Sequence, residues 1–206
     1  MGLNVLIKVP SQTDWYMMYE MAKSQAILGI CFNGVQKLYK VHPEAVVNLP
    51  FELRMKWFGI TVEIQKKNIK MYQKCNLLAE EIGKSGLRNC VLKGQGLAIA
   101  YPNELQSLRQ SGDIDLWVEG KRDDIVNYIR SKGVKVYDVH LVHATAEFFE
   151  DVPVEIHFCP SWMYNPFLNR RLQSFFASQA SEQFAHYDEK VGFAYPTVCF
   201  NLVHSM

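Results

Sequence analysis

The sequence predicts an α+β fold, a mixed sheet flanked by helices with a helical N-terminal region, and three observations support this. Apolar residues recur at three- and four-residue spacing over residues 11–40 and 51–85, which is typical of amphipathic helices and predicts a helical region over residues 1–85. Over residues 86–160, short apolar runs alternate with helical segments, as in a layer built on one sheet. Helical spacing returns over residues 161–206. We therefore expect a helical region, an α/β core and a C-terminal helical segment that is incomplete, because its pattern is cut off.

Two helical stretches are expected before the core. The first covers residues 11–40 and is broken by Pro43. The second covers residues 51–85, enters at Pro50 and meets a plausible stop at Gly83. Their methionine and aromatic side chains recur at helical spacing, so we expect them to pack in a core rather than to bind a ligand.

The core elements follow from changes of period and from glycine and proline positions. We expect a strand over residues 88–94, a short helix over 95–102, a strand over 111–120 and a helix over 121–133. One or two strands over 134–150, a turn over 151–153 and a last strand over 154–158 follow. This order places the chemistry-bearing segments on strands or at their ends.

Composition excludes several classes of protein. The 206 residues are 49% hydrophobic, enough for a buried core. A net charge of +1 without a basic run disfavours an extended nucleic-acid surface. Five cysteines without a CxxC pair disfavour a structural zinc site or a secreted disulfide scaffold. The N-terminal apolar run is too short for a signal peptide and no stretch is long enough to span a membrane, so we expect a cytoplasmic protein without membrane contact.

Asp113 and Asp115 stand on either side of Ile114 in "SGDIDLWVEG". Alternate residues of a strand point to the same side, so the two carboxylates are expected to lie close together. Bulk water, a basic side chain or a metal ion must offset their repulsion. Mg²⁺ prefers carboxylate oxygens, and paired ions can assist phosphoryl chemistry. A solvated strand edge explains the pair equally well.

Glu155 and His157 share one face of the expected strand "VEIHF". If this strand lies beside residues 111–120, Glu155 completes a cluster of three carboxylates; the alternative is a surface glutamate paired with a basic residue. His157 is expected either to hydrogen-bond a ligand or the carboxylates, or to be structural. His140 and His143 are expected to be structural, because the spacing of the histidines does not predict a convergent zinc site.

The segment "VLKGQG" places Gly94 and Gly96 between a strand and a helix. Glycines allow the backbone to approach a ligand closely, and a helix N-terminus favours phosphate. An ordinary strand–helix turn is the alternative.

Together these segments resemble a known family. A glycine-containing strand–helix turn, Gly-Asp-x-Asp on a strand and a carboxylate on a later strand resemble the nucleotidyltransferase superfamily of the DNA polymerase beta type. More narrowly, "LKG", "YP", "SGDIDLWV" and "VEIHF" resemble its uncharacterised bacterial nucleotidyltransferases. The resemblance covers about residues 60–206 and implies a nucleotidyltransferase-like sheet.

The resemblance also implies roles for the carboxylates. Asp113, Asp115 and Glu155 would be the catalytic residues and the ligands of two Mg²⁺ ions, with Mn²⁺ as an alternative. Glu155 would take the proton of an acceptor hydroxyl, whose pKa the metal lowers. A nucleoside monophosphate would pass from an NTP to that acceptor, which would be a small molecule, a protein or an RNA end.

The same resemblance implies phosphate contacts from Gly94, Gly96, Lys93, Arg109 and His157. Lys93 would offer a point charge in a turn where many relatives have small residues; a solvent-facing lysine is the alternative. Arg109 would neutralise phosphate charge or, alternatively, pair with the aspartates. The competing function is a nucleotide-binding or protein-interaction module on the same fold with little or no turnover.

Overall fold

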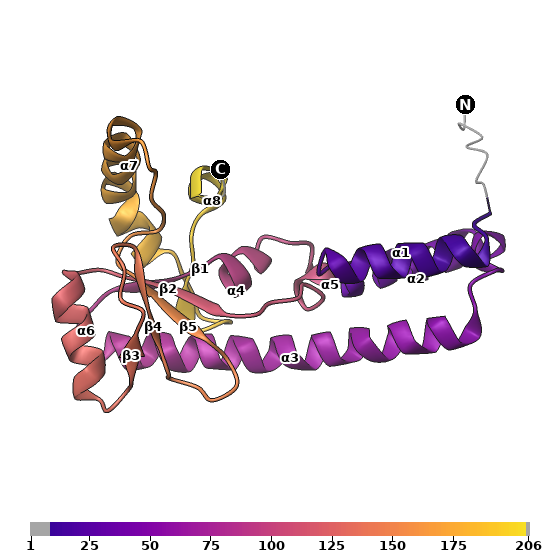
Figure 1. Ribbon diagram of the computed structural model, residues 1–206, viewed down its shortest axis with the longest axis horizontal. Coiled ribbons are helices and arrows are strands. Elements are labelled where there is room, and N and C mark those ends of the chain that lie inside the picture. The colour runs from indigo at the N-terminus through magenta and orange to yellow at the C-terminus, as the bar shows by residue number, and fades with distance from the viewer. Residues whose placement is uncertain (1–8, 205–206) are drawn as a thin grey trace. The chain divides into compact units, whose positions relative to one another are not determined.

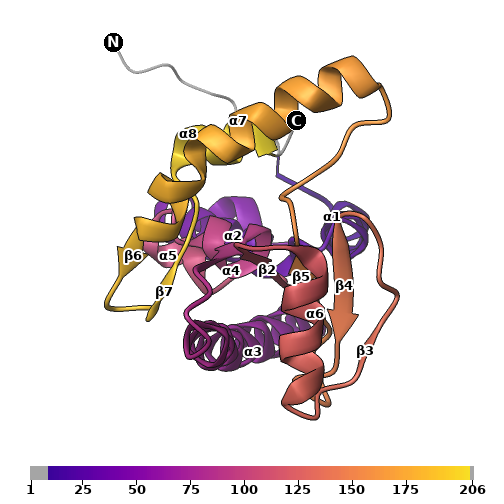
Figure 2. The same ribbon diagram turned by 90° about the vertical axis from the view of Figure 1, so that its left-hand side faces the viewer.

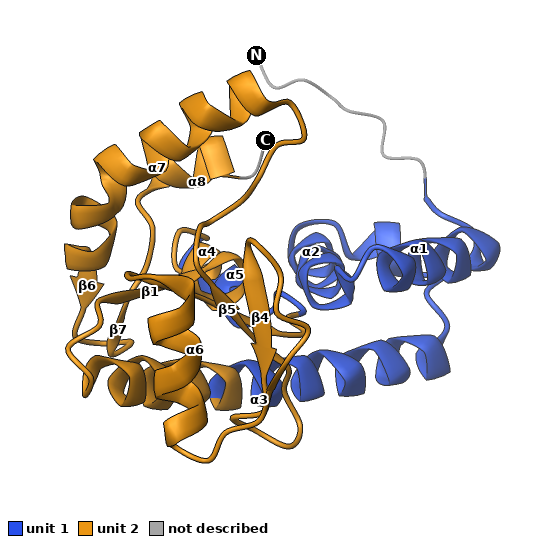
Figure 3. Cartoon of the chain, turned by 60° about the vertical axis from the view of Figure 1, so that its left-hand side comes forward, with its two compact units in different colours: residues 1–69, 102–110 blue, residues 70–101, 111–206 orange. Residues whose placement is uncertain are grey.

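The computed structural model describes residues 9–204 and confirms the α+β class (Figure 1). The N-terminal run considered as a leader and the last two residues lie outside this range. The chain divides into two compact units, Met1–Ile69 with Pro102–Gln110, and Lys70–Tyr101 with Ser111–Met206 (Figure 3). The three-part division at residues 85 and 160 stays a prediction. None of the helices within residues 9–204 is long and apolar enough to cross a membrane.

Unit 1 is helical. Its elements are α1 (Gln12–Ser24), α2 (Leu28–Val41), a 3₁₀ turn η1 (Pro43–Val46), the part of α3 (Phe51–Gly83) that ends at Ile69, and α5 (Asn103–Gln106). Ser11 begins α1 with a capping box, in which Ser11 and Asp14 satisfy each other's backbone N–H groups. The single helix expected over residues 11–40 is broken, because Ala26 has a φ of 54°, which an α-helix cannot accommodate.

A buried aromatic cluster holds unit 1 together. Trp57 is fully buried, and its ring contacts Tyr19 edge-to-face at 5.4 Å and Phe32 at 5.7 Å between ring centroids. Its indole N–H donates to the Leu28 carbonyl at 2.8 Å. Of the methionine and aromatic side chains of α3 in unit 1, Trp57 therefore lies in the core as the sequence predicts, whereas Phe51, Met55 and Phe58 are exposed.

Unit 2 is built on a five-stranded mixed sheet with the order β1-β2-β5-β4-β3. The strands are β1 (Asn89–Leu92), β2 (Ile114–Val118), β3 (Val136–Tyr137), β4 (His143–Ala146) and β5 (Val154–His157). β2 pairs with β1 antiparallel and with β5 parallel, and β4 pairs antiparallel with β5. Two helices, α4 (Lys93–Ala98) and α6 (Arg122–Ser131), occupy connections between strands.

Different helices cover the two faces of this sheet (Figure 2). One face packs on α6 and on the unit 2 part of α3 through aliphatic side chains. On the opposite face, Trp117 packs against α7 (Pro166–Ala185) and α8 (Val198–His204) through aromatic side chains. Since side chains of β2 and β5 alternate between the faces, the polar residues of these strands lie on the α7–α8 side.

The C-terminal region departs from the expected helical pattern at one place. Between α7 and α8 the chain forms a hairpin of β6 (Tyr187–Asp188) and β7 (Phe193–Ala194). Two-residue strands are too short to show the alternation by which a strand is identified in sequence. Gly192 closes the turn with a φ of 79°, a conformation that glycine adopts without strain.

Candidate functional site

Strand pairing gathers four polar residues on one face of the unit 2 sheet. Asp115 of β2 is in register with Glu155 of β5, and His157 of β5 is in register with His143 of β4. Partners in register share a face, and Glu155 and His157 are two residues apart on one strand. The strands that carry Asp115 and Glu155 are therefore neighbours, as the predicted cluster of carboxylates requires.

Asp115 is nearly fully buried, and two basic side chains converge on it. Its Oδ1 accepts hydrogen bonds from Lys93 Nζ at 2.8 Å and from His157 Nε2 at 2.8 Å. Burial alone would raise the pKa of Asp115, but these hydrogen bonds outweigh it and hold the pKa at about 2. The sequence left bulk water, a basic side chain or a metal ion to offset the repulsion between the aspartates. At Asp115 the structure shows basic side chains.

Asp113 lies one residue before β2 and is exposed to solvent. Partial loss of hydration, followed by the negative charges of Asp115 and Glu155, raises the pKa of Asp113 above its ordinary value. The three carboxylates are therefore close enough to influence one another electrostatically. Their role as metal ligands stays a prediction.

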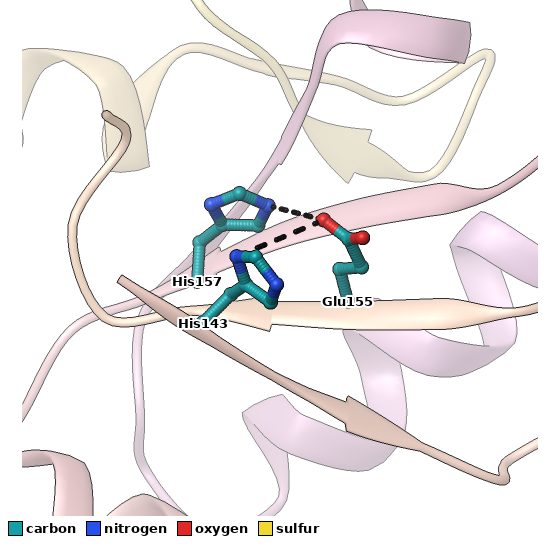
Figure 4. Close-up of side chains that lie close together, drawn as sticks. All are labelled: His143, Glu155 and His157. Atoms are coloured by element: carbon teal, nitrogen blue, oxygen red, sulfur yellow. Dashed lines mark ion pairs between the residues drawn. The ribbon is translucent and has the colours of Figure 1, made fainter. Parts of the chain in front are cut away.

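Glu155 lies beside two histidines on the same sheet face, and both approach the same carboxylate oxygen (Figure 4). Its Oε2 is 3.3 Å from His157 Nε2 and 4.0 Å from His143 Nδ1. One potential ligand atom from each of the three residues lies within 4.8 Å of the others. The hydrogen bond from His157 lowers the pKa of Glu155.

The expectations for His157 and His143 have different outcomes. His157 is buried and hydrogen-bonded to the carboxylates, one of the two roles predicted for it. Burial opposes its charged form, but the hydrogen bonds to Asp115 and Glu155 raise the pKa of His157 overall. β4 pairs with β5 and places His143 opposite His157 and near Glu155, a proximity that the spacing of the histidines does not predict; the structural role expected of His143 stays a prediction. The sequence contains no local signal for that pairing.

The turn after β1 has an unusual backbone. Lys93 has a φ of 39° and Gly94 a φ of 22°, and only glycine adopts such values without strain. A Cβ on Gly96 would lie 2.0 Å from the Val91 carbonyl oxygen, so a side chain there would force α4 away from β1. Gly94 thus serves the bend and Gly96 the packing of α4, and Lys93 is directed to Asp115. The predicted phosphate contacts of this turn stay predictions.

A further imidazole on α8 borders the site. His204 Nε2 lies 3.0 Å from the Pro160 carbonyl oxygen. Burial lowers the pKa of His204, and the positive charges of Lys93 and His157 lower it further, against the effect of the Pro160 contact. Sequence reasoning did not identify His204, because its proximity depends on how α8 packs on the sheet.

Arg109, predicted to contact phosphate, belongs to unit 1. Its Nη1 donates to the Gln110 carbonyl at 3.5 Å. The alternatives of a phosphate contact and of pairing with the aspartates both stay predictions.

Comparison with models of protein families gives a match. A family described as "Uncharacterised nucleotidyltransferase" matches residues 11–201, which include every strand of the five-stranded sheet and all the site residues predicted from the sequence. Comparison with curated proteins and with solved structures gives no match.

Proposed function

The chain belongs to this uncharacterised nucleotidyltransferase family, and on that premise we propose that it transfers a nucleoside monophosphate from an NTP to an acceptor hydroxyl. The observation that supports this most directly is the register of Asp115 with Glu155, which sets two carboxylates side by side on adjacent strands. Asp113 extends the group at the start of β2. The reaction would release pyrophosphate.

The donor set fits a hard divalent cation. Asp113, Asp115 and Glu155 offer carboxylate oxygens, which Mg²⁺ prefers, and Mn²⁺ is an alternative. Asp115 stays ionised near neutral pH, because its pKa of about 2 lies far below it. Two such ions, when bound, would neutralise phosphate charge and lower the pKa of the acceptor hydroxyl.

The chain's own residues would position the reactants and move one proton. The acceptor oxygen attacks the α-phosphorus, and the bond from that phosphorus to the oxygen bridging it to the β-phosphate breaks. Glu155, about one-third exposed, accepts the acceptor's proton. Lys93, half-exposed beside Asp115, offers its positive charge to the departing phosphates, and the turn at Gly94 brings backbone N–H groups toward them.

The acceptor is proposed only by chemical type, a hydroxyl on a small molecule, a protein or an RNA end. A net charge of +1 disfavours the extended phosphate-binding surface that a long RNA requires. Arg109 remains a proposed phosphate contact.

One observation favours the second candidate, a nucleotide-binding module with little or no turnover. Both Lys93 and His157 bond to the same oxygen of Asp115, so a metal ion has to compete with two hydrogen bonds at that atom. Weak metal binding at Asp115 would leave nucleotide recognition without efficient transfer.

The proposal is tested by calorimetric titration of each NTP in the presence of Mg²⁺. We expect binding by the wild-type chain and its loss in Asp113→Asn/Asp115→Asn. The matched control Asp123→Asn/Asp124→Asn changes two exposed aspartates at the start of α6 and should bind as the wild type does. Equal binding by the site variant and the control would refute the assignment.

A pyrophosphate-release assay with candidate acceptors then separates the two functions. Release that depends on Glu155 supports transfer. Binding without release over a broad acceptor set supports the nucleotide-binding module.

A further inference from the structure

We propose that His143, Glu155 and His157 form a binding site for one transition-metal ion, for which Zn²⁺ is the probe. The site differs in donor type from the three-carboxylate group, although Glu155 belongs to both. Its existence does not depend on the proposed nucleotide transfer, because it is inferred from the donor atoms alone.

The separations are close to those of a coordinated ion. Glu155 Oε2 lies 3.3 Å from His157 Nε2 and 4.0 Å from His143 Nδ1, and all three ligand atoms lie within 4.8 Å of one another (Figure 4). Ligands about 2.1 Å from a tetrahedral ion are roughly 3.4 Å apart. Small side-chain movements are therefore sufficient to bring the three atoms onto one ion.

Rigid elements hold these donors in place. Glu155 and His157 lie on β5, and His143 lies opposite His157 on the neighbouring β4. Neighbouring strands fix the spacing of such side chains through the backbone ladder, which a pair of loops does not. The site therefore requires little reorganisation to form.

The donor chemistry selects the class of ion. Two imidazole nitrogens and one carboxylate suit Zn²⁺ and related first-row ions, and two histidines with one glutamate leave further coordination positions open. Mg²⁺ prefers oxygen ligands and near-octahedral geometry, and this set offers oxygen only from Glu155. Selectivity for a transition ion over Mg²⁺ follows.

The proton on His157 does not prevent metal binding. A nitrogen that binds a metal must be deprotonated, so the ring proton has to reside on Nδ1. Nδ1 of His157 is buried, and among residues 9–204 it has no hydrogen-bond partner, so Nδ1 can take up that proton, at the cost of the hydrogen bond from Nε2 to Asp115. Asp115 keeps its contact with Lys93 at 2.8 Å when His157 is withdrawn from it.

The site is also accessible. The side chains of His143 and Glu155 are each 29% exposed, whereas His157 is 3% exposed. An ion can therefore enter from the side of His143 and Glu155. The buried His157 forms the base of the site.

The test is calorimetric titration of the folded, full chain with Zn²⁺ alone and with Mg²⁺ alone, in the absence of nucleotide. We expect one Zn²⁺ per chain, bound more tightly than Mg²⁺. His143→Ala and the polar variant His143→Gln should each weaken Zn²⁺ binding by at least about tenfold. Loss of an outer-shell partner alone weakens metal binding by about 10–100-fold, so loss of a direct ligand should cost at least the lower of these values. Circular dichroism checks that each variant is folded.

His140→Ala is the matched control, because His140 is exposed, belongs to the same segment and contacts the His143 ring at 5.7 Å between centroids. It should retain wild-type Zn²⁺ affinity. The inference is overturned if the wild type binds Zn²⁺ no better than Mg²⁺, if both His143 variants bind like wild type, or if His140→Ala loses as much. Loss of NTP binding in the aspartate variant of the earlier test bears on the proposed function and not on this result.

Discussion

Replacing Gly96 by alanine should destabilise unit 2, because α4 lies directly on β1 at this residue. The added Cβ would lie 2.0 Å from the Val91 carbonyl oxygen and 3.0 Å from the Val91 carbonyl carbon. Non-bonded carbon atoms pack at about 3.5–4.0 Å, so the Cβ would lie about 0.5–1 Å too close to the carbonyl carbon, and it would lie closer still to the carbonyl oxygen. Val91 is paired with Leu116 in the sheet, and its carbonyl cannot retreat without disturbing that ladder.

The size of the effect follows from two opposing contributions. Overpacking a well-filled interior costs about 1–3 kcal/mol, and an overlap with backbone belongs at the upper end. Alanine is favoured over glycine within a helix by about 1 kcal/mol, which offsets part of that cost. We expect a net loss of about 2 kcal/mol in the free energy of unfolding, measured by urea unfolding with circular dichroism and tryptophan fluorescence.

Gly59→Ala is the matched control. Gly59 lies within α3, and a Cβ there meets nothing within 4 Å. The same substitution should therefore stabilise the chain, by up to about 1 kcal/mol. A Gly96→Ala variant that unfolds at the urea concentration of the wild type, or above it, would show that the packing argument is wrong.

Two further substitutions test other parts of the fold. Arg88 donates to both carboxylate oxygens of Glu119, at 2.6 and 2.7 Å, which lowers the pKa of Glu119 below its ordinary 4.5. The stabilisation is present above pH 4.5 and is lost as the pH falls through the lower pKa of the folded state. Glu119→Gln should therefore cost at most about 1 kcal/mol at pH 7, and progressively less as the pH falls below 4.5. Urea unfolding across this pH range measures it, and a difference independent of pH would contradict the linkage. Trp57→Phe removes the buried bond to Leu28 and part of a core ring, and should cost about 2–3 kcal/mol in chemical unfolding, whereas the control Trp162→Phe, half-exposed, should change stability by less than about 0.5 kcal/mol.

Much of the fold is readable from sequence because it rests on local pattern. The strand "VEIHF" and the helix over residues 121–133 are predicted within a few residues of β5 and α6. The break at Ala26 and the hairpin before α8 are not, since a single residue with positive φ and strands of two residues leave no periodic trace.

The candidate site shows the same division. The sequence contains Asp115, Glu155 and His157 on strands and predicts that they share a face if their strands are neighbours. The sequence does not predict the partner of Lys93. The expected partner was a phosphate or bulk solvent, whereas the structure shows a hydrogen bond to Asp115.

By itself the sequence determined which residues can do chemistry and which face of each strand they occupy, because side-chain alternation is a local property of the chain. Tertiary structure alone decided which strands are neighbours. The order β1-β2-β5-β4-β3 places Asp115 of β2 next to Glu155 of β5. It also places His143 of β4 opposite His157 of β5. That order depends on how the whole sheet is packed between α3 and α6 on one side and α7 and α8 on the other, a balance of non-local burial that no short segment encodes.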